Sequence, residues 1–408
     1  MTLTAGAAKL DITPEDLTAL NPIGGGTFSG VHDPIFVRAL VLHDGTTETA
    51  LVSADLIEAG DMTGVRQRIE WELGIGFDRI IITATHAHNA PRIGLVSPGA
   101  LAHNGGPESA AYTELVYDTI IAALVRARAA AVPARFGVGT GTADVNVNRD
   151  VYADGKWSLG FNPDGPSDKT VWVVKFEGLD GAPIAVVLNY AVHSTVTLWT
   201  NLVSGDLAGA ATRYVEEQLG GVALWTLGSV GDQNPRIALG KATADVDRDR
   251  AFAFQAMDAQ GLIVGAETVR VARSITHLTE TARIAAAQRI IECPVKKGVD
   301  VMDDMLQEDV PFVSLRLALL MIGQIAFAGV SGEVVTSIYW RLRKESPLAS
   351  TILISIANDR IGYLPEDAAF DRPTHEVNGC PIVRGHAEDA IIHGLTAMIE
   401  SELTARTS

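Results

Sequence analysis

The fold is indicated most clearly by residues 80–91, whose sequence is IIITATHAHNAP. The three isoleucines predict a strand covered on both faces, and the polar residues before Pro91 mark where that strand ends. Because side chains two residues apart in an extended chain point the same way, we expect His86 and His88 to face one cavity. Two imidazoles at a strand end are typical of a metal site, and ordinary hydrogen bonding by the same residues is the alternative.

Strand-like and helix-like segments alternate on both sides of this stretch. We expect strands at residues 35–43, 48–56, 79–85, 134–140, 170–177, 183–195, 222–228, 311–330 (two strands turning near Gly323) and 351–357. We expect helices at residues 61–73, 109–130, 206–219, within 243–272, and at 334–345 and 385–403. This mixture predicts the α/β class, with a layered mixed β-sheet flanked by helices. Since the chain has no linker-like segment and no repeat, we expect one catalytic domain over residues 1–408.

The composition is that of a compact globular protein, with 47% hydrophobic residues, 20% charged residues and a net charge of −17. This charge would repel a polyanion, so we expect a small-molecule substrate and no nucleic acid. No stretch reaches the ~18 consecutive apolar residues of a membrane span, which predicts no membrane insertion. The N-terminus does not resemble a secretion signal, and two cysteines, Cys293 and Cys380, indicate a reducing compartment, so we expect a cytoplasmic protein. Assembly into a homo-oligomer is an alternative that the sequence leaves open.

Two further apolar runs end in polar residues. The run at 184–192 leads to His193, and the run at 222–228 leads to a polar segment that contains glycine. We expect these strand ends to share a rim with the first one. Asp206 lies where a helix begins and is expected to be structural, with catalysis as the alternative. The loop at 150–169, rich in Gly, Pro and Asp, is expected to be either a lid or rim of the site or a surface excursion.

Short motifs along the chain occur in the order seen in one enzyme family. They are AGAAKLDITP (5–14), GVHDPIFVRALVL (30–42), THAHNAP (85–91), VNVNRD (145–150), NYAVHSTVT (189–197), GSVGDQNP (228–235), GVSGE (329–333) and YLPEDAAF (363–370). Together they make the chain resemble the N-terminal catalytic domain of the neutral ceramidases. The resemblance extends over nearly all 408 residues. It leaves no segment for the immunoglobulin-like C-terminal domain of full-length ceramidases.

The resemblance implies a zinc site. The family binds one catalytic zinc through two histidines, a glutamate and a tyrosine, which correspond here to His86, His193, Glu333 and Tyr363. Zinc accepts such nitrogen and oxygen ligands and, in catalytic sites, leaves a position for water or substrate. The alternatives are hydrogen-bonded histidines at strand ends, a glutamate that begins a helix, and a packed tyrosine. A phenol with a pKa of about 10 binds zinc only when the metal lowers that pKa.

The resemblance also assigns residues around the metal. His88 corresponds to a second active-site histidine, which can exchange a proton with the attacking water or the leaving amine. Arg149 corresponds to an active-site arginine and can hold a carbonyl oxygen or a substrate carboxylate; a surface arginine is the alternative. One position departs from the family, because ceramidases carry a serine where this chain has Asn234. The amide of Asn234 can donate to an oxyanion but cannot act as an alcohol nucleophile.

The sequence therefore predicts a zinc-dependent hydrolase. The leading hypothesis is an amidase that cleaves the C–N bond of a small or medium substrate with metal-activated water, and that is not a true ceramidase. A lactonase or esterase with the same zinc site is one alternative, and a binding protein without turnover on the same scaffold is another. The carboxylates of Asp55, Asp206 and Asp232 are near these motifs and leave a second metal ion open.

Overall fold

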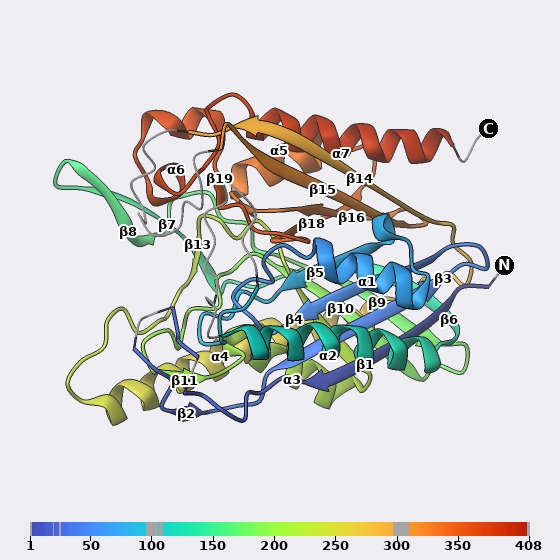
Figure 1. Ribbon diagram of the computed structural model, residues 1–408, viewed down its shortest axis with the longest axis horizontal. Coiled ribbons are helices and arrows are strands. Elements are labelled where there is room, and N and C mark those ends of the chain that lie inside the picture. The colour runs from blue at the N-terminus through green and yellow to red at the C-terminus, as the bar shows by residue number, and fades with distance from the viewer. Residues whose placement is uncertain are drawn as a thin grey trace.

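Two β-sheets pack face to face, and helices cover their outer faces, in a layered α/β arrangement (Figure 1). The α/β class with mixed sheets that the sequence predicts is confirmed. The computed structural model describes residues 2–18, 20–23, 26–94, 105, 109–296 and 310–405.

The larger sheet has eight strands and mixes antiparallel pairs with the parallel pairs β4–β5 and β10–β12. Their spatial order is β12 (Val222–Leu227), β10 (Pro183–Tyr190), β9 (Thr170–Gly178), β6 (Val132–Thr142), β1 (Thr4–Asp11), β3 (Phe36–His43), β4 (Glu48–Ala54) and β5 (Ile80–Ala84). The smaller sheet has the order β14 (Ile284–Pro294), β15 (Phe312–Ile322), β16 (Ile325–Val330) and β18 (Ser350–Ser355).

Short strands lie beside these two sheets. They are β2 (Gly30–Val31) with β11 (Leu202–Val203), β13 (Gln233–Pro235) with β7 (Asn146–Ala153) and β8 (Lys156–Asn162), and β17 (Glu333–Val334) with β19 (Tyr363–Leu364). The helices are α1 (Thr63–Leu73), α2 (Ala110–Ala129), α3 (Asp206–Leu219), α4 (Val246–Ser274), α5 (Thr336–Glu345), α6 (His375–Asn378) and α7 (Ala387–Thr404). In the described part of the chain, none of these helices has the length and apolar character needed to cross a membrane.

The alternation of side chains along each strand produces the layers. In β3, Val37 and Val41 pack with α2, whereas Leu40 and Leu42 point the other way and pack against the smaller sheet. Helices α3 and α4 cover the other half of the larger sheet, and α5 and α7 cover the outer face of the smaller one. Both faces of the central strands are therefore buried, which explains their continuous apolar sequences.

Three expectations about local structure were wrong or incomplete. Strand β10 ends at Tyr190 and not at residue 195, because the polar residues beyond it turn away from the sheet. The segment at 150–169 is not one loop, since much of it belongs to the β7–β8 hairpin. Its turn is Asp154–Gly155, with φ of 53° and 77°, a pattern that favours a two-residue hairpin turn. Strands β1 and β14 were missed because small and polar residues interrupt their apolar alternation.

Candidate metal centre

Three segments that are far apart in the sequence meet at one end of the two sheets. His86 follows β5, His193 follows β10, and Glu333 begins β17. A bridge between Ala87 and Ser194 ties the first two segments together, and the His88 amide donates to the Ser194 carbonyl at 3.0 Å. The structure thus brings the two histidines and the glutamate from the sequence hypothesis into one cluster.

Backbone carbonyls fix the orientation of two of the imidazoles. His86 Nδ1 lies 2.6 Å from the Ile57 carbonyl oxygen, and His193 Nδ1 lies 2.9 Å from that of Gln233. Since a carbonyl only accepts, the ring proton belongs on Nδ1 in both, and each Nε2 carries a lone pair. Burial, together with the charge of Arg149, lowers the pKa of His193 to about 3, so this ring is neutral.

Glu333 faces these two lone pairs. Its Oε2 atom lies 3.1 Å from His193 Nε2 and 3.4 Å from His86 Nε2, and it is buried without a hydrogen-bond donor. Its Oε1 atom accepts from Arg360 Nε at 2.8 Å and Nη2 at 2.6 Å. Burial by itself would raise the pKa of Glu333, but the charge of Arg360 holds it well below the usual value. His86 Nε2, His193 Nε2 and Glu333 Oε2 therefore converge at one buried point, an arrangement of nitrogen and oxygen atoms that fits a bound cation.

His88 lies beside this cluster. Its Nε2 atom is 3.3 Å from His86 Nε2, and the ligand atoms of His86, His88 and His193 all lie within 4.8 Å of one another. The explanation expected for this proximity was wrong: His86 has φ of 60°, outside the extended region, so a turn brings the two rings together and strand alternation does not. His88 is only half-buried and lines an adjacent cavity.

Tyr363 is placed by the short sheet that also holds Glu333. The two residues are partners in the parallel β17–β19 pair. Burial, followed by the charge of Glu333, raises the pKa of Tyr363 to about 12, so without a metal the phenol keeps its proton. Its ring lies 5.2 Å from the Arg149 guanidinium carbon and makes an edge contact with His375.

The Arg149 side chain is held by the carboxylate of Glu376, which has the carboxyl group of Asp150 as a neighbour. Its Nε donates to Glu376 at 2.7 Å, and its Nη1 lies 3.2 Å from His193 Nε2 and 3.3 Å from Asn234 Oδ1. Its Nη2 is buried and has no partner. Burial and the neighbouring Glu376 raise the pKa of Asp150 to about 9, so Asp150 keeps its proton at neutral pH and Glu376 is the charged partner of Arg149. Arg149 therefore keeps one donor group to offer.

A cavity of about 590 Å³ opens beside the metal centre. Polar side chains and apolar side chains both line it, and the hairpin β7–β8 forms part of its wall, as the rim alternative for residues 150–169 predicts. The lining residues that matter for the argument are His88, Arg149, His193, Asn234, Tyr363 and His375 on the polar side and Leu159, Phe161, Leu198, Trp199 and Leu239 on the apolar side.

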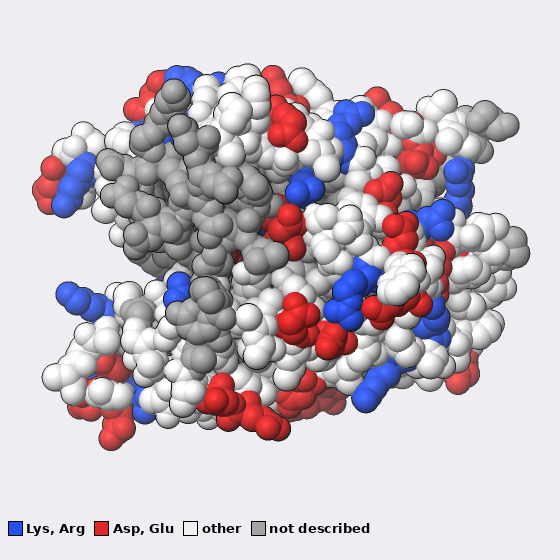
Figure 2. Space-filling model, in the orientation of Figure 1, with Lys and Arg blue, Asp and Glu red and all other residues white. Residues whose placement is uncertain are grey.

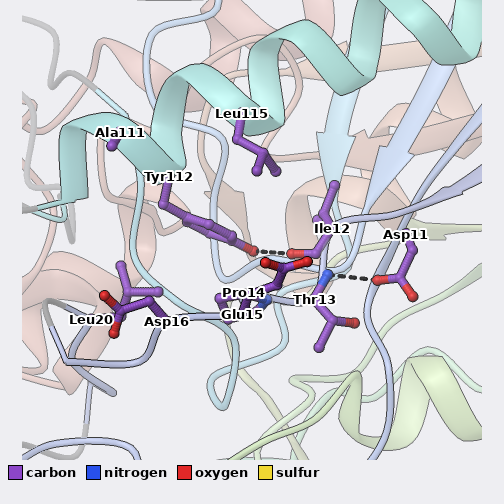
Figure 3. A pocket seen from close by; sticks show the side chains of 10 residues that line it. All are labelled: Asp11, Ile12, Thr13, Pro14, Glu15, Asp16, Leu20, Ala111, Tyr112 and Leu115. Atoms are coloured by element: carbon purple, nitrogen blue, oxygen red, sulfur yellow. Dashed lines mark hydrogen bonds between the residues drawn. The ribbon is translucent and has the colours of Figure 1, made fainter.

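A second cavity, of about 680 Å³, lies between the end of β1 and α2 (Figure 3). Asp11, Glu15 and Asp16 line it, and the Tyr112 hydroxyl donates to the Ile12 carbonyl at 2.6 Å. Its described lining holds no histidine and no residue of the metal centre. Of these two cavities, the one beside His88 adjoins the metal centre, so it is the candidate substrate site.

The three carboxylates considered for a second metal ion have other partners. Asp55 pairs with Arg38 at 2.7 Å. The Asp206 carboxylate accepts from the Thr197 amide and hydroxyl, and Asp232 accepts from the amide and hydroxyl of Thr336. The structural role expected for Asp206 agrees with these bonds, although it bonds to a neighbouring turn and not as a simple helix cap.

Sequence reasoning missed two residues of the site. Arg360 neutralises Glu333, and Glu376 holds Arg149. A signal for Arg360 was present, because it follows β18 in another polar strand end, the same pattern that singled out His86. Glu376 had no such signal, since it lies on the short helix α6 and does not follow a predicted strand.

Comparisons with known proteins agree with this geometry. A family model described as neutral/alkaline non-lysosomal ceramidase, N-terminal, matches residues 5–237. Neutral ceramidases B and A of Dictyostelium discoideum are each 28% identical to this chain, over 158 and 160 residues. These alignments cover 35% of this chain and only 20% and 21% of the two relatives, so the chain matches about a fifth of their length.

Solved structures extend the likeness to nearly the whole chain. The neutral ceramidase of Pseudomonas aeruginosa gives a TM-score of 0.79 at 16% identity, covering 99% of this chain and 75% of that one. A ceramidase complexed with C2 gives a TM-score of 0.77 at 17% identity, covering 99% of this chain and 76% of that one. At these identities the solved structures establish a shared fold.

Proposed function

The chain belongs to the neutral/alkaline non-lysosomal ceramidase family, and from that premise we propose that it is a zinc-dependent amidohydrolase. Its substrate is a small or medium amide, and the C–N bond is cleaved by water. The observation that carries this proposal is the position of Glu333 Oε2, which lies 3.1 Å from His193 Nε2 and 3.4 Å from His86 Nε2 in a buried cluster.

The residues present fit zinc. His86, His193 and Glu333 supply two nitrogen donors and one oxygen donor, and Tyr363 is the neighbouring oxygen that could complete the set. Hydrogen bonds from Nδ1 to backbone carbonyls already fix both imidazoles, and Arg360 fixes the glutamate. When bound, zinc would lower the pKa of a water molecule toward ~7 and polarise the substrate carbonyl.

The remaining residues of the site handle protons and charge. His88 lies at the junction of the metal centre and the cavity, so it can take a proton from the attacking water and give one to the leaving amine. Arg149 offers the unpartnered Nη2 group to the carbonyl oxygen, on which negative charge develops. Asn234, whose Oδ1 already faces Arg149, keeps its Nδ2 group as a second donor.

The substitution at position 234 supports an amide other than ceramide. The alcohol that the family carries at this position is absent, while the two histidines, the glutamate and the arginine are retained. Hydrolysis by activated water does not need that alcohol. Cleavage of a lactone or ester by the same groups is the alternative outcome of the test.

The experiment is metal analysis of protein purified without chelator, followed by a matched panel of amide, ester and lactone substrates. We expect about one zinc per chain and the highest kcat/KM on an amide. Preference for the ester or lactone would change the reaction assigned to the centre. Absence of bound metal together with absence of turnover would overturn the proposal.

A further inference from the structure

The cavity beside the metal centre differs in charge from the rest of the protein. The chain has a net charge of −17, and acidic and basic side chains are interspersed on the face shown in Figure 2. The described lining of the cavity, in contrast, contains two arginines, three histidines and no aspartate or glutamate. The positive charge of this lining comes from its two arginines, so the cavity favours an anionic group although the protein as a whole is acidic.

One of the two arginines, Arg236, lies on the same wall as Asn234. The Arg236 amide donates to the Val145 carbonyl at 2.7 Å, which fixes the backbone just beyond the end of β13 at Pro235. Gln233 points the other way and donates to Thr336 at 3.0 Å. Asn234 and Arg236 both line the cavity, with Pro235 between them.

The charge of Arg236 is only partly neutralised. Its Nη1 lies 3.0 Å from Asp144 Oδ1, and Lys169 Nζ lies 3.0 Å from the same oxygen atom. One carboxylate thus serves two cations, and the trio keeps a net positive charge. The Arg236 guanidinium also lies over the Phe161 ring, at 5.3 Å, which holds it against the hairpin wall of the cavity.

The other walls of the cavity are apolar and determine which part of a substrate can lie beside its negatively charged group. Leu159 and Phe161 from the hairpin face a cavity that Leu198, Trp199 and Leu239 also line. An apolar segment can be buried against these side chains while a charged end meets Arg236. Asn234 contacts Arg149 at 3.3 Å, so two residues of chain separate the reacting end from Arg236 at the charged end. Two residues span at most about 7 Å, the length of a few covalent bonds.

We propose that the substrate carries a carboxylate, bound by Arg236, a few bonds from the scissile amide and next to an apolar segment. This proposal names the substrate class of the amide hydrolysis proposed above, and its turnover test rests on that function. The carboxylate can belong to the amine part, as in an N-acyl amino acid, or to the acyl part, as in a monoamide of a dicarboxylic acid. Both present the same anion to Arg236.

The test compares matched substrates with the zinc-loaded enzyme. N-octanoylglycine is paired with N-octanoylglycinamide, and N-octylsuccinamic acid with its neutral diamide. We expect the carboxylate member of one pair to have the higher kcat/KM, and Arg236→Gln to lower that value roughly 10- to 100-fold, mainly through KM, while the neutral member changes little. Whichever pair shows the effect identifies the side that carries the charge.

Two further variants sharpen the result. Arg68→Gln is the matched control, because Arg68 is also a partly exposed arginine with carboxylate partners but lies on α1. Asp144→Asn removes the carboxylate that competes for Arg236, so the preference for the charged substrate should increase severalfold. A parent enzyme that prefers the neutral members, or an Arg236→Gln variant that lowers both members equally, would overturn the proposal.

A binding measurement separates this proposal from the catalytic one. Calorimetry with N-octanoylglycine and chelator-treated protein needs no turnover. We expect N-octanoylglycine to bind at least 10-fold more tightly than its glycinamide, and this difference to disappear in Arg236→Gln. Binding without turnover of any compound would keep the anion site and reject the amidohydrolase. Equal binding of the two compounds would reject the anion site.

Discussion

Two buried clusters of charged residues in this molecule differ in how their polar atoms are paired. Around Arg38, donors face acceptors: Nη1 donates to Asp55 at 2.7 Å, Nε to Glu216 at 3.2 Å, and Nη2 to Thr212 at 3.1 Å. Around Glu333, Oε1 is paired with Arg360, but Oε2 lies 3.1 Å from His193 Nε2 and 3.4 Å from His86 Nε2, two atoms that can bind a cation together with it.

The difference shows how a structural ion cluster can be separated from a site for a ligand. A buried charge is tolerated when partners compensate it, as at Arg38. Buried acceptors that converge without a donor are costly unless a further cation joins them. Composition alone does not distinguish the clusters, since Asp55 and Glu333 are both buried acidic residues close to the end of a buried strand.

The largest effect is expected from removing a proposed metal donor. His193→Ala should leave purified protein without zinc and with turnover at background, because one member of the donor set is lost. His86→Ala should behave in the same way. Inductively coupled plasma analysis together with an activity assay checks both. Full zinc occupancy in either variant would contradict the proposal that the Glu333 cluster, unlike the Arg38 cluster, binds a metal ion.

His88→Ala should reduce kcat by roughly 10²–10⁴ while zinc is retained, since a general acid–base group is lost and the donors of the centre are not. Steady-state kinetics and metal content are measured on the same preparation. Loss of zinc from this variant would instead make His88 a member of the donor set.

Arg38→Met tests the cluster around Arg38, in which donors and acceptors pair with one another. The substitution leaves Asp55 buried without its cation, so we expect a loss of about 3–5 kcal/mol in the free energy of unfolding, measured by urea denaturation. Zinc content should be unchanged, because no atom of this cluster faces the metal centre. A variant of normal stability would show that the charges at Arg38 are not needed by the fold.

Asn234→Ala should reduce kcat by roughly 10²–10³ with a smaller change in KM if the amide is an oxyanion donor. A variant with nearly unchanged kinetics would make Asn234 a turn residue that only fills the space of the family's serine. Asn234→Ser is the companion variant, and we expect it to hydrolyse little ceramide. Strong ceramide hydrolysis by the parent or by this variant would contradict the proposed change of substrate.

The last prediction concerns Asp150 and the pH dependence of stability. The pKa of its carboxyl is raised to about 9 in the folded protein, whereas in the unfolded chain it ionises at about 4. Between these values only the folded state keeps the proton, so this group makes stability fall as pH rises from 4 to 9. Asp150→Asn should flatten that slope in urea denaturation at pH 5, 7 and 9, and the exposed Asp118→Asn should not. An unchanged slope would contradict the proton on Asp150.

Long apolar patterns made most of the fold predictable. The helix at 206–219 has the expected bounds, and the 311–330 segment forms two strands around Gly323, which has φ of 58°. Strands β1 and β14 were less visible because neighbouring strands and packing, more than their own alternation, define them. The Asp154–Gly155 pair was an available hairpin signal that the loop interpretation did not use.

The site was predictable where it depends on strand ends, and not where it depends on tertiary contacts. The histidines at positions 86, 88 and 193 were identified because polar residues interrupt apolar runs. The carbonyl groups that face Nδ1 of His86 and His193, and the Glu376 carboxylate that holds Arg149, come from residues remote in sequence. Only the folded chain shows such partners, so neither the orientation of the rings nor the role of Glu376 could be derived from the sequence.

The long separation between His86 and Glu333 has a consequence for how the protein matures. During synthesis both histidines leave the ribosome well before the glutamate, and until the two sheets have packed together they remain a weak, exchangeable donor pair. Stable metal binding should then be a late step of folding. The rate of metal uptake during refolding would report how fast the complete chain reaches its packed structure.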